Sequence, residues 1–186
     1  MGKHLVTGGS GYVGNFIVNR LSDMGEEVIS LDVIQSNNKI NNVEYVIGSV
    51  LDKELINSLV SSCDYVHHNA ALVPLTKSGS MFAKTNVYGT ETILKKSIQH
   101  NIKHFSHMSS SAVFGIQDSD SPFTNLSRRN PVDTYGKSKK EAEDIVLAAM
   151  SADIKTTFSI IRPRTILGPN RLGIFELLFK NEFVKC

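Results

Sequence analysis

Two side chains able to exchange a proton with an alcohol lie four residues apart, in Tyr135-Gly136-Lys137-Ser138-Lys139. The segment is typical of a helix, and residues four apart share a helical face, so both groups reach one pocket. A phenol is a poor base at neutral pH, with an unperturbed pKa of about 10. A neighbouring ammonium lowers that pKa, which makes the pair a candidate acid/base couple. Because a single Tyr-x-x-x-Lys spacing arises readily by chance, the rest of the chain must supply something for the couple to act with.

A glycine-rich turn near the amino terminus supplies it. The run Gly8-Gly9-Ser10-Gly11-Tyr12-Val13-Gly14 follows a buried-strand pattern and continues into an apolar helical pattern. Gly8 allows a tight turn, Gly11 lets the backbone approach a pyrophosphate, and Gly14 lets the helix pack closely on the strand. The helix N-terminus offers N–H groups to phosphates. The alternative is an ordinary glycine-rich connection, but the order of strand, turn and helix favours dinucleotide binding.

An acidic residue ends the next predicted strand. Asp32 lies about eighteen residues after Gly14, near the spacing of a carboxylate that accepts hydrogen bonds from the adenosine ribose. Because a carboxylate repels a 2′-phosphate, Asp32 favours NAD over NADP. The alternative is a loop aspartate after a strand, and the glycine turn favours the ribose role.

Composition excludes several classes of function. The 186 residues predict one domain, perhaps with a small appendage, and 41% hydrophobic content suffices for a core. A net charge of +2 with scattered basic residues does not indicate nucleic-acid binding. The chain shows no apolar run long enough for a membrane span and no secretory signal pattern, so we expect a cytoplasmic protein. We expect no metal, because Cys63 and Cys186 are too far apart and His100, His104 and His107 do not share a face.

Strand and helix patterns alternate, which predicts an α/β fold: a doubly wound parallel sheet with helices on both faces. The predicted strands are residues 4–7, 27–32, 43–47, 64–68, 103–108 and 156–161, and the later helices are 52–61, 81–99 and 133–150. Ligands bind at the carboxyl ends of such strands. One edge should therefore gather Gly8, Asp32, Ala70, Ser109 and Pro163. Residues 117–130 are predicted to form a surface loop, with Arg128-Arg129 as a solvated charge pair.

Six short motifs occur in a recognisable order. They are the glycine turn at 7–14, then 66–71, 86–90, 109–115, 135–139, and 161–163 with 167–169. Together they resemble the extended short-chain dehydrogenase/reductase family, the NAD-dependent sugar-nucleotide epimerases and dehydratases, such as UDP-glucose 4-epimerase. The resemblance runs nearly end to end and implies a Rossmann-like domain.

The resemblance implies a role for each matched residue. Tyr135 would be the acid/base, Lys139 would hold the nicotinamide ribose, and Ser110 would hydrogen-bond the reacting oxygen, although Ser109 and Ser111 are close enough to exchange places with it. Asn86 would support the site through backbone contacts. The implied NAD-binding residues are Gly8, Gly11, Tyr12, Val13, Gly14, Asp32, Ser49, Val50, Ala70, Ala71, Asn86, Ser109, Tyr135, Lys139 and Pro163. The implied reaction is hydride transfer between NAD and a secondary alcohol, with a nucleotide sugar as substrate.

Three residues depart from the family pattern. Ser49 follows Gly48 where an acid is usual, Phe114 replaces a tyrosine, and Thr165 stands where many sugar-nucleotide enzymes have an asparagine. Two alternatives therefore remain: a 3β-hydroxysteroid-type or other ketone dehydrogenase of the same superfamily, and a non-catalytic NAD-binding module or inactive fragment.

The length of the chain is a further departure, because family members continue into a smaller substrate domain. We expect residues 1–170 to form the NAD-binding domain and 171–186 to begin a truncated C-terminal substrate region, with an amphipathic helix at 173–179. Most of the smaller domain would then be missing. The family also implies a homodimer that forms through the helices at 81–99 and 133–150.

Overall fold

Six strands of the described residues form one parallel sheet. The computed structural model describes residues 1–37, 39–73, 81–116, 121–152 and 155–172. The strands are β1 (Lys3–Thr7), β2 (Glu27–Asp32), β3 (Val43–Ile47), β4 (Tyr65–His68), β5 (His104–Met108) and β6 (Thr157–Ile161). The helices are α1 (Tyr12–Asp23), α2 (Lys53–Ser61), α3 (Gly89–Gln99) and α4 (Thr134–Met150), with a π-helical segment η1 (Ala83–Tyr88) and a 3-10 turn η2 (Ser111–Val113). The strand order β3-β2-β1-β4-β5-β6 confirms the predicted Rossmann-like fold.

Strand β1 lies between β2 and β4 in the interior of the sheet, and both of its faces are buried. Leu5 pairs with Ile29 of β2 and with Val66 of β4, and all three side chains are at most 1% exposed. Strands covered on both faces are short apolar runs. The apolar pattern at residues 4–7 therefore predicted this strand correctly.

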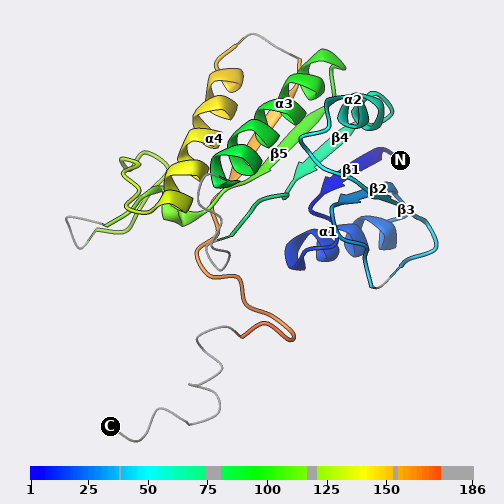
Figure 1. The fold of residues 1–186 in the computed structure, drawn as a ribbon, viewed down its shortest axis with the longest axis horizontal. Helices are drawn as coiled ribbons and strands as arrows, with labels where there is room; N and C mark the ends of the chain where they lie inside the picture. Colours follow the sequence, from blue (N-terminus) through cyan, green and yellow to red (C-terminus); the bar gives the residue numbers. More distant parts are fainter. Residues whose placement is uncertain (38, 74–80, 117–120, 153–154, 173–186) are drawn as a thin grey trace, which may run out of the picture.

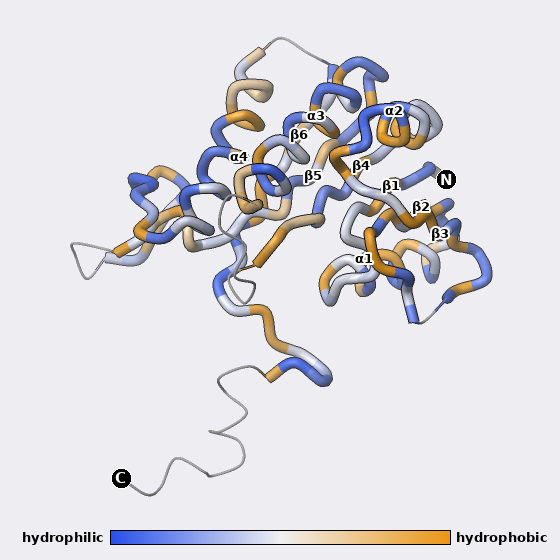
Figure 2. The backbone as a smooth tube through the Cα atoms, viewed as in Figure 1, coloured by the Kyte–Doolittle hydropathy of each residue, from blue (hydrophilic) through white to orange (hydrophobic). Residues whose placement is uncertain are grey.

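Helices pack on both faces of the sheet, as predicted. Helices α2, α3 and α4 cover one face, and α1 covers the other (Figure 1). Apolar and polar residues alternate around these helices (Figure 2), so each presents an apolar side to the sheet. The core under α2–α4 includes Leu5, Ile93, Phe105 and Val146, and the core under α1 consists of Val6, Val18, Val28 and Val43.

Acidic caps fix the starts of two helices. Asp52 accepts from the backbone N–H of Glu54 (3.2 Å) and of Leu55 (3.0 Å) and caps α2. Asp133 accepts from Gly136 N at 2.6 Å and caps α4. None of the described helices is both long and apolar enough to span a bilayer. The helix predicted at 173–179 lies outside the described residues, and the domain boundary at 170 stays a prediction.

The helix predicted over 81–99 is not one continuous α-helix. Residues Ala83–Tyr88 form π-helical turns, and α3 begins only at Gly89. A Cβ on Gly89 would lie 2.7 Å from Val50 Cγ2, so the start of α3 packs tightly against the segment after β3. Hydrophobic periodicity does not distinguish π-helical turns from α-helical turns. Such π-helical turns occur frequently at functional sites.

Candidate functional site

The predicted site residues meet at the carboxyl edge of the sheet. Gly8 N donates to Leu31 O at 2.8 Å, which joins the ends of β1 and β2. Asn69 N donates to Thr7 O at 3.1 Å, and Ser109 N donates to Ile161 O at 2.7 Å. The turns after these strands are therefore held side by side.

The glycine turn leaves no space for side chains at two positions. Gly8 has φ +68°, and a Cβ there would lie 2.8 Å from Ala70 N. A Cβ on Gly14 would overlap the carbonyl oxygen of Gly8. The first N–H groups of α1 have no acceptor within the helix. They belong to Tyr12, Val13 and Gly14, and Gly11 precedes them without a capping side chain.

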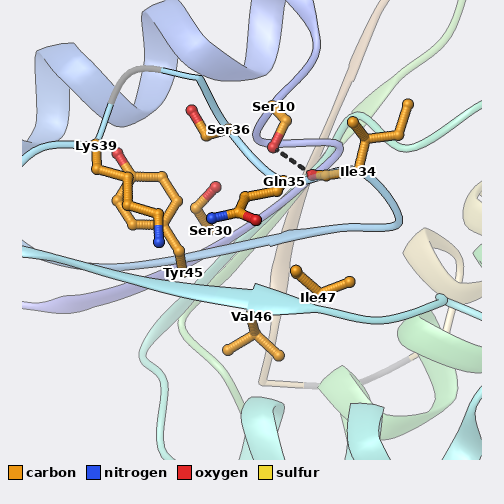
Figure 3. Close-up of a pocket in the computed structure, with 9 residues that line it drawn as sticks. All are labelled: Ser10, Ser30, Ile34, Gln35, Ser36, Lys39, Tyr45, Val46 and Ile47. Carbon is orange, nitrogen blue, oxygen red and sulfur yellow. Dashed lines mark hydrogen bonds between the residues drawn. The ribbon is translucent and has the colours of Figure 1, made fainter.

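Asp32 is held at the end of β2 by two backbone N–H groups. Oδ2 accepts from Ser10 N at 3.0 Å, and Oδ1 accepts from Ile34 N at 3.2 Å. A cavity of about 40 Å³ lies beside Ser10, which bonds to the Ile34 carbonyl (Figure 3). Ser30 also lines this cavity, and its buried hydroxyl has no hydrogen-bond partner among the described residues.

Two residues after β3, Ser49 and Val50, were implied to bind NAD, and they differ in their surroundings. The Ser49 hydroxyl accepts from Leu51 N at 3.2 Å within its own turn. Val50 is 5% exposed and belongs to the core.

A buried polar chain fixes the end of β4. Thr7 Oγ1 accepts from Ala70 N at 3.3 Å and contacts His68 Nδ1 at 2.8 Å, and His68 Nε2 lies 2.9 Å from Thr90 Oγ1. Burial lowers the pKa of His68 to about 3, so its imidazole is neutral. This chain links β1, β4 and α3 directly below the glycine turn, and Ala71 follows it half-buried.

Asn86 occupies the π-helical segment and is 1% exposed. Its Oδ1 accepts from Leu72 N at 2.8 Å, and its Nδ2 donates to Leu72 O at 3.2 Å and to Ser138 Oγ at 3.0 Å. These contacts join the segment after β4 to α4, the helix that carries the acid/base couple. The resemblance implied backbone contacts for Asn86, and its bonds to Leu72 are of that type.

The Ser110 side chain lies close enough to Tyr135 to act on the pKa of its phenol. Ser110 has an extended backbone, and its Oγ accepts from Ala112 N at 3.2 Å. Burial raises the pKa of Tyr135, and the interaction with Ser110 offsets part of that rise. Ser109 instead donates to Glu143 at 2.5 Å, so of these two serines Ser110 is the one directed to Tyr135.

Lys139 lies one turn after Tyr135 and is 3% exposed. Its Nζ donates to Met108 O at 2.6 Å. Burial lowers the pKa of Lys139 to about 8, against the opposing effect of the Glu143 charge. The sequence predicted that Lys139 lowers the pKa of Tyr135. The pKa of Tyr135 is raised instead, because burial dominates and the ammonium points to a carbonyl oxygen.

Sequence reasoning missed Glu143 and misassigned Arg129. Glu143 is fully buried and binds Ser109, Arg129 and Arg162, whereas Arg129 was predicted to be solvated. The one available signal was an acid four residues after Lys139, on the helical face that also carries Ala142.

An open pocket of about 560 Å³ lies next to the serine turn. Phe114 and Phe123 stack with ring centroids 4.7 Å apart, and the Arg162 guanidinium lies 5.3 Å above the Phe114 ring. The lining residues are Ser111, Phe114, Phe123, Thr124, Asn125, Arg162 and Arg164. The pocket therefore combines aromatic surface with an exposed arginine, Arg164. The carbonyl oxygen of Pro163, the residue between Arg162 and Arg164, accepts from Ser111 N at 2.9 Å.

His100, His104 and His107 do not meet at one place. His104 bonds to Thr157 and Ser159, His100 bonds to Asn57, and His107 is buried on the other face of β5 from His104. Among the described residues no group of three possible metal-binding side chains occurs.

Comparisons with known proteins identify related sequences. A family model described as the NAD dependent epimerase/dehydratase family matches residues 4–177. UDP-glucose 4-epimerase of Halalkalibacterium halodurans is 32% identical over 152 residues, which cover 75% of this chain and 43% of that protein. 3-beta-hydroxysteroid dehydrogenase of Mycolicibacterium neoaurum is 31% identical over 193 residues, covering 97% of this chain and 52% of that one.

The fold matches solved structures along the whole chain. The Bordetella bronchiseptica enzyme WbmH, solved in complex with NAD+, superposes with a TM-score of 0.84 at 26% identity. That match covers 100% of this chain and 64% of WbmH. The chain spans about half the length of the curated relatives that it matches.

Proposed function

Because the chain belongs to the NAD-dependent epimerase/dehydratase family, we propose that it binds NAD at the carboxyl edge of its sheet and transfers hydride between NAD and a secondary alcohol. One observation carries this proposal: Ser110 acts on the Tyr135 phenol, and Lys139, one helical turn after Tyr135, bonds to Met108 O at 2.6 Å. Helix α4 and the end of β5 thus bring these three residues together at the carboxyl edge of the sheet.

The residues around the glycine turn fit a dinucleotide. A side chain on Gly8 or Gly14 would clash with backbone, so both positions require glycine. The turn can therefore pack closely and leave its backbone without covering side chains. The unpaired N–H groups at the start of α1 suit a pyrophosphate. The Asp32 carboxylate, held by Ser10 N and Ile34 N, suits ribose hydroxyls and disfavours a 2′-phosphate.

The protein groups supply proton transfer and orientation. When bound, NAD would accept a hydride from the carbon that carries the alcohol. Tyr135 would take the hydroxyl proton, and Ser110 would hydrogen-bond the same oxygen. Because burial raises its pKa, Tyr135 is protonated at neutral pH and is ready to donate a proton to a ketone. Taking a proton requires the Lys139 ammonium to stabilise the phenolate.

For the substrate we propose a nucleotide sugar. The pocket beside Ser111 offers aromatic rings and the exposed Arg164, which suit a ring and an anionic group. The related UDP-glucose 4-epimerase supports this class. Thr165 and the relation to 3-beta-hydroxysteroid dehydrogenase favour a second candidate, a hydroxysteroid-type dehydrogenase. The homodimer and the cytoplasmic location stay predictions, as does the choice between epimerase and dehydratase.

Calorimetric titration with NAD and NADP tests the first step. We expect binding of NAD in preference to NADP, and absence of NAD binding would contradict the proposal. Hydride transfer is then measured with UDP-, GDP- and dTDP-sugars and with a 3β-hydroxysteroid. Tyr135→Phe should abolish transfer but retain NAD binding. The matched control is Tyr65→Phe, which removes a phenol at the start of β4, at the opposite edge of the sheet. NAD binding without transfer from any substrate would favour the non-catalytic module.

A further inference from the structure

Glu143 is a fully buried carboxylate on α4, one turn after Lys139 and two turns after Tyr135. Its Oε1 accepts from Ser109 Oγ at 2.5 Å and from Arg162 Nε at 2.9 Å. Its Oε2 accepts from Arg162 Nη2 at 2.9 Å and from Arg129 Nη1 at 3.1 Å. These four bonds use the acceptor capacity of an ionised carboxylate.

The partners of Glu143 come from the segments that frame the candidate site. Ser109 directly precedes Ser110, and Arg162 follows the last residue of β6. The same two segments are joined by Ser109 N to Ile161 O and by Ser111 N to Pro163 O. Glu143 therefore ties the turn that carries Ser110 to the helix that carries Tyr135.

A purely structural role does not require charges in this place. A buried ion pair can often be replaced by apolar side chains of similar volume without loss of stability. Arg162 takes both carboxylate oxygens in a bidentate pair, and Arg129 is shared with Asp144, whose Oδ1 lies 2.7 Å from Arg129 Nη2. Glu143 is thus the buried acid of a charged network whose outer end, at Asp144 and Lys140, is partly exposed.

The charge of Glu143 acts on Lys139. His68 of β4 and His107 of β5 interact electrostatically with Lys139, and burial lowers the pKa of both, so they are neutral. Tyr135 is protonated at neutral pH. Among the described residues, Glu143 is the group whose charge raises the pKa of Lys139 against the effect of burial.

We propose that Glu143 is a positioning residue of the candidate site: it aligns Ser110 with Tyr135 through Ser109 and Arg162, and it balances the buried ammonium of Lys139. The inference rests on the proposed function for its consequence, because Lys139 would hold the nicotinamide ribose. The contacts of Glu143 and the titration of Lys139 are measurable without any ligand.

The test compares Glu143→Gln with Asp144→Asn. Both changes turn a carboxylate into an amide on the same helix, and both carboxylates contact Arg129, but Asp144 is 43% exposed at its side chain and contacts neither Ser109 nor Arg162. The titration of Lys139 is followed by NMR in protein labelled at lysine Cε, with Lys139→Arg to assign the resonance. We expect Glu143→Gln to move the midpoint down from about 8 by about one unit and Asp144→Asn to leave it in place.

NAD binding supplies the second readout. If the Lys139 midpoint falls from about 8 to about 7, a smaller fraction of Lys139 carries the charge that would hold the ribose at about pH 7.5, and Glu143→Gln should bind NAD about threefold more weakly. At about pH 5.5 Lys139 is protonated in both proteins, so the two should bind NAD equally. A change that only loosened the fold would weaken binding at both pH values, and that result would overturn the proposal.

Four other outcomes have a defined meaning. An unchanged Lys139 midpoint in Glu143→Gln overturns the inference, and so does an equal shift in Asp144→Asn. If the parent protein does not bind NAD, the proposed function fails, but the Lys139 titration still tests the inference. If Glu143→Gln does not fold, Glu143→Asp withdraws the carboxylate by one methylene and should give a smaller downward shift, and the absence of that shift overturns the inference.

Discussion

Replacing Lys139 by methionine should stabilise the fold while it removes NAD binding. The Lys139 side chain is 3% exposed, and burial lowers its pKa from 10.5 to about 8. The folded state therefore holds an ammonium that it disfavours relative to the unfolded chain. Methionine has a similar length and no charge, so it fits the same space without that cost.

The size of the effect follows from the pKa. A shift from 10.5 to about 8 destabilises the folded state at neutral pH by about 3 kcal/mol, since one unit is worth about 1.4 kcal/mol. The variant loses the bond from Nζ to Met108 O, which offsets about 1–2 kcal/mol. The net gain is about 1–2 kcal/mol, or about 5 °C in Tm for a chain of this size.

The stability difference between the two proteins should depend on pH. Below about pH 8 Lys139 is charged in both states, so the full penalty applies to the parent protein. As the pH rises from about 8 toward 10.5, the folded state releases its proton first and the parent protein gains stability. The advantage of Lys139→Met should therefore be largest at neutral pH and should shrink by about 2 kcal/mol at about pH 9.5.

Urea denaturation at about pH 7 and about pH 9.5 measures both quantities. The control is Lys140→Met, which removes the next lysine along α4, a partly exposed partner of Asp144. We expect that control to change stability by less than about 0.5 kcal/mol at either pH. A Lys139→Met variant that is less stable than the parent at neutral pH, or whose advantage does not vary with pH, would refute the reasoning.

Two further predictions concern the frame of the site. Gly14→Ala should prevent NAD binding and lower the free energy of unfolding by about 1–3 kcal/mol, because its Cβ would overlap Gly8 O. A Cβ on Gly11 would lie 3.1 Å from the same oxygen, so Gly11→Ala should lower stability and NAD binding less. Calorimetry and thermal denaturation of the two variants compare them, and equal effects would contradict the argument. Asn86→Leu should cost about 3 kcal/mol, because it leaves Leu72 N and its carbonyl without their buried partner. Urea denaturation beside Asn125→Leu, a change at an exposed loop position, measures that cost, and similar losses in both would argue against it.

The fold was predictable from sequence because its signals are local. The sequences of β1 and β2 are short and apolar, and glycines occupy the first turn. Asp52, a residue type that commonly caps helices, directly precedes α2. Each of these signals depends on a few neighbouring residues. The π-helical turns around Asn86 were not predictable, because local periodicity does not distinguish them from α-helical turns and the partner of Asn86, Leu72, lies fourteen residues earlier along the chain.

The same distinction separates the site residues. Tyr135 and Lys139 were found because a helix fixes their relation. Glu143 was not singled out, because its partners Ser109 and Arg162 lie 34 and 19 residues away and follow no spacing rule. Burial also reversed the predicted direction of the Tyr135 pKa shift, since sequence spacing carries no information on desolvation.

The glycine turn also has a consequence for the order of folding. Its closest neighbours are Asn69 and Ala70, and Ala70 N bonds to Thr7 Oγ1 across 63 positions of sequence. Helices such as α1 and α2 form from local contacts, but β4 must close a long loop before it pairs with β1, and such non-local pairings are slow. A nascent chain that ends after α2 therefore has the glycines of the turn and their bonds to β2, but not the contact with the segment after β4. We expect the complete turn, and with it the proposed binding of the dinucleotide, only when β4 has docked.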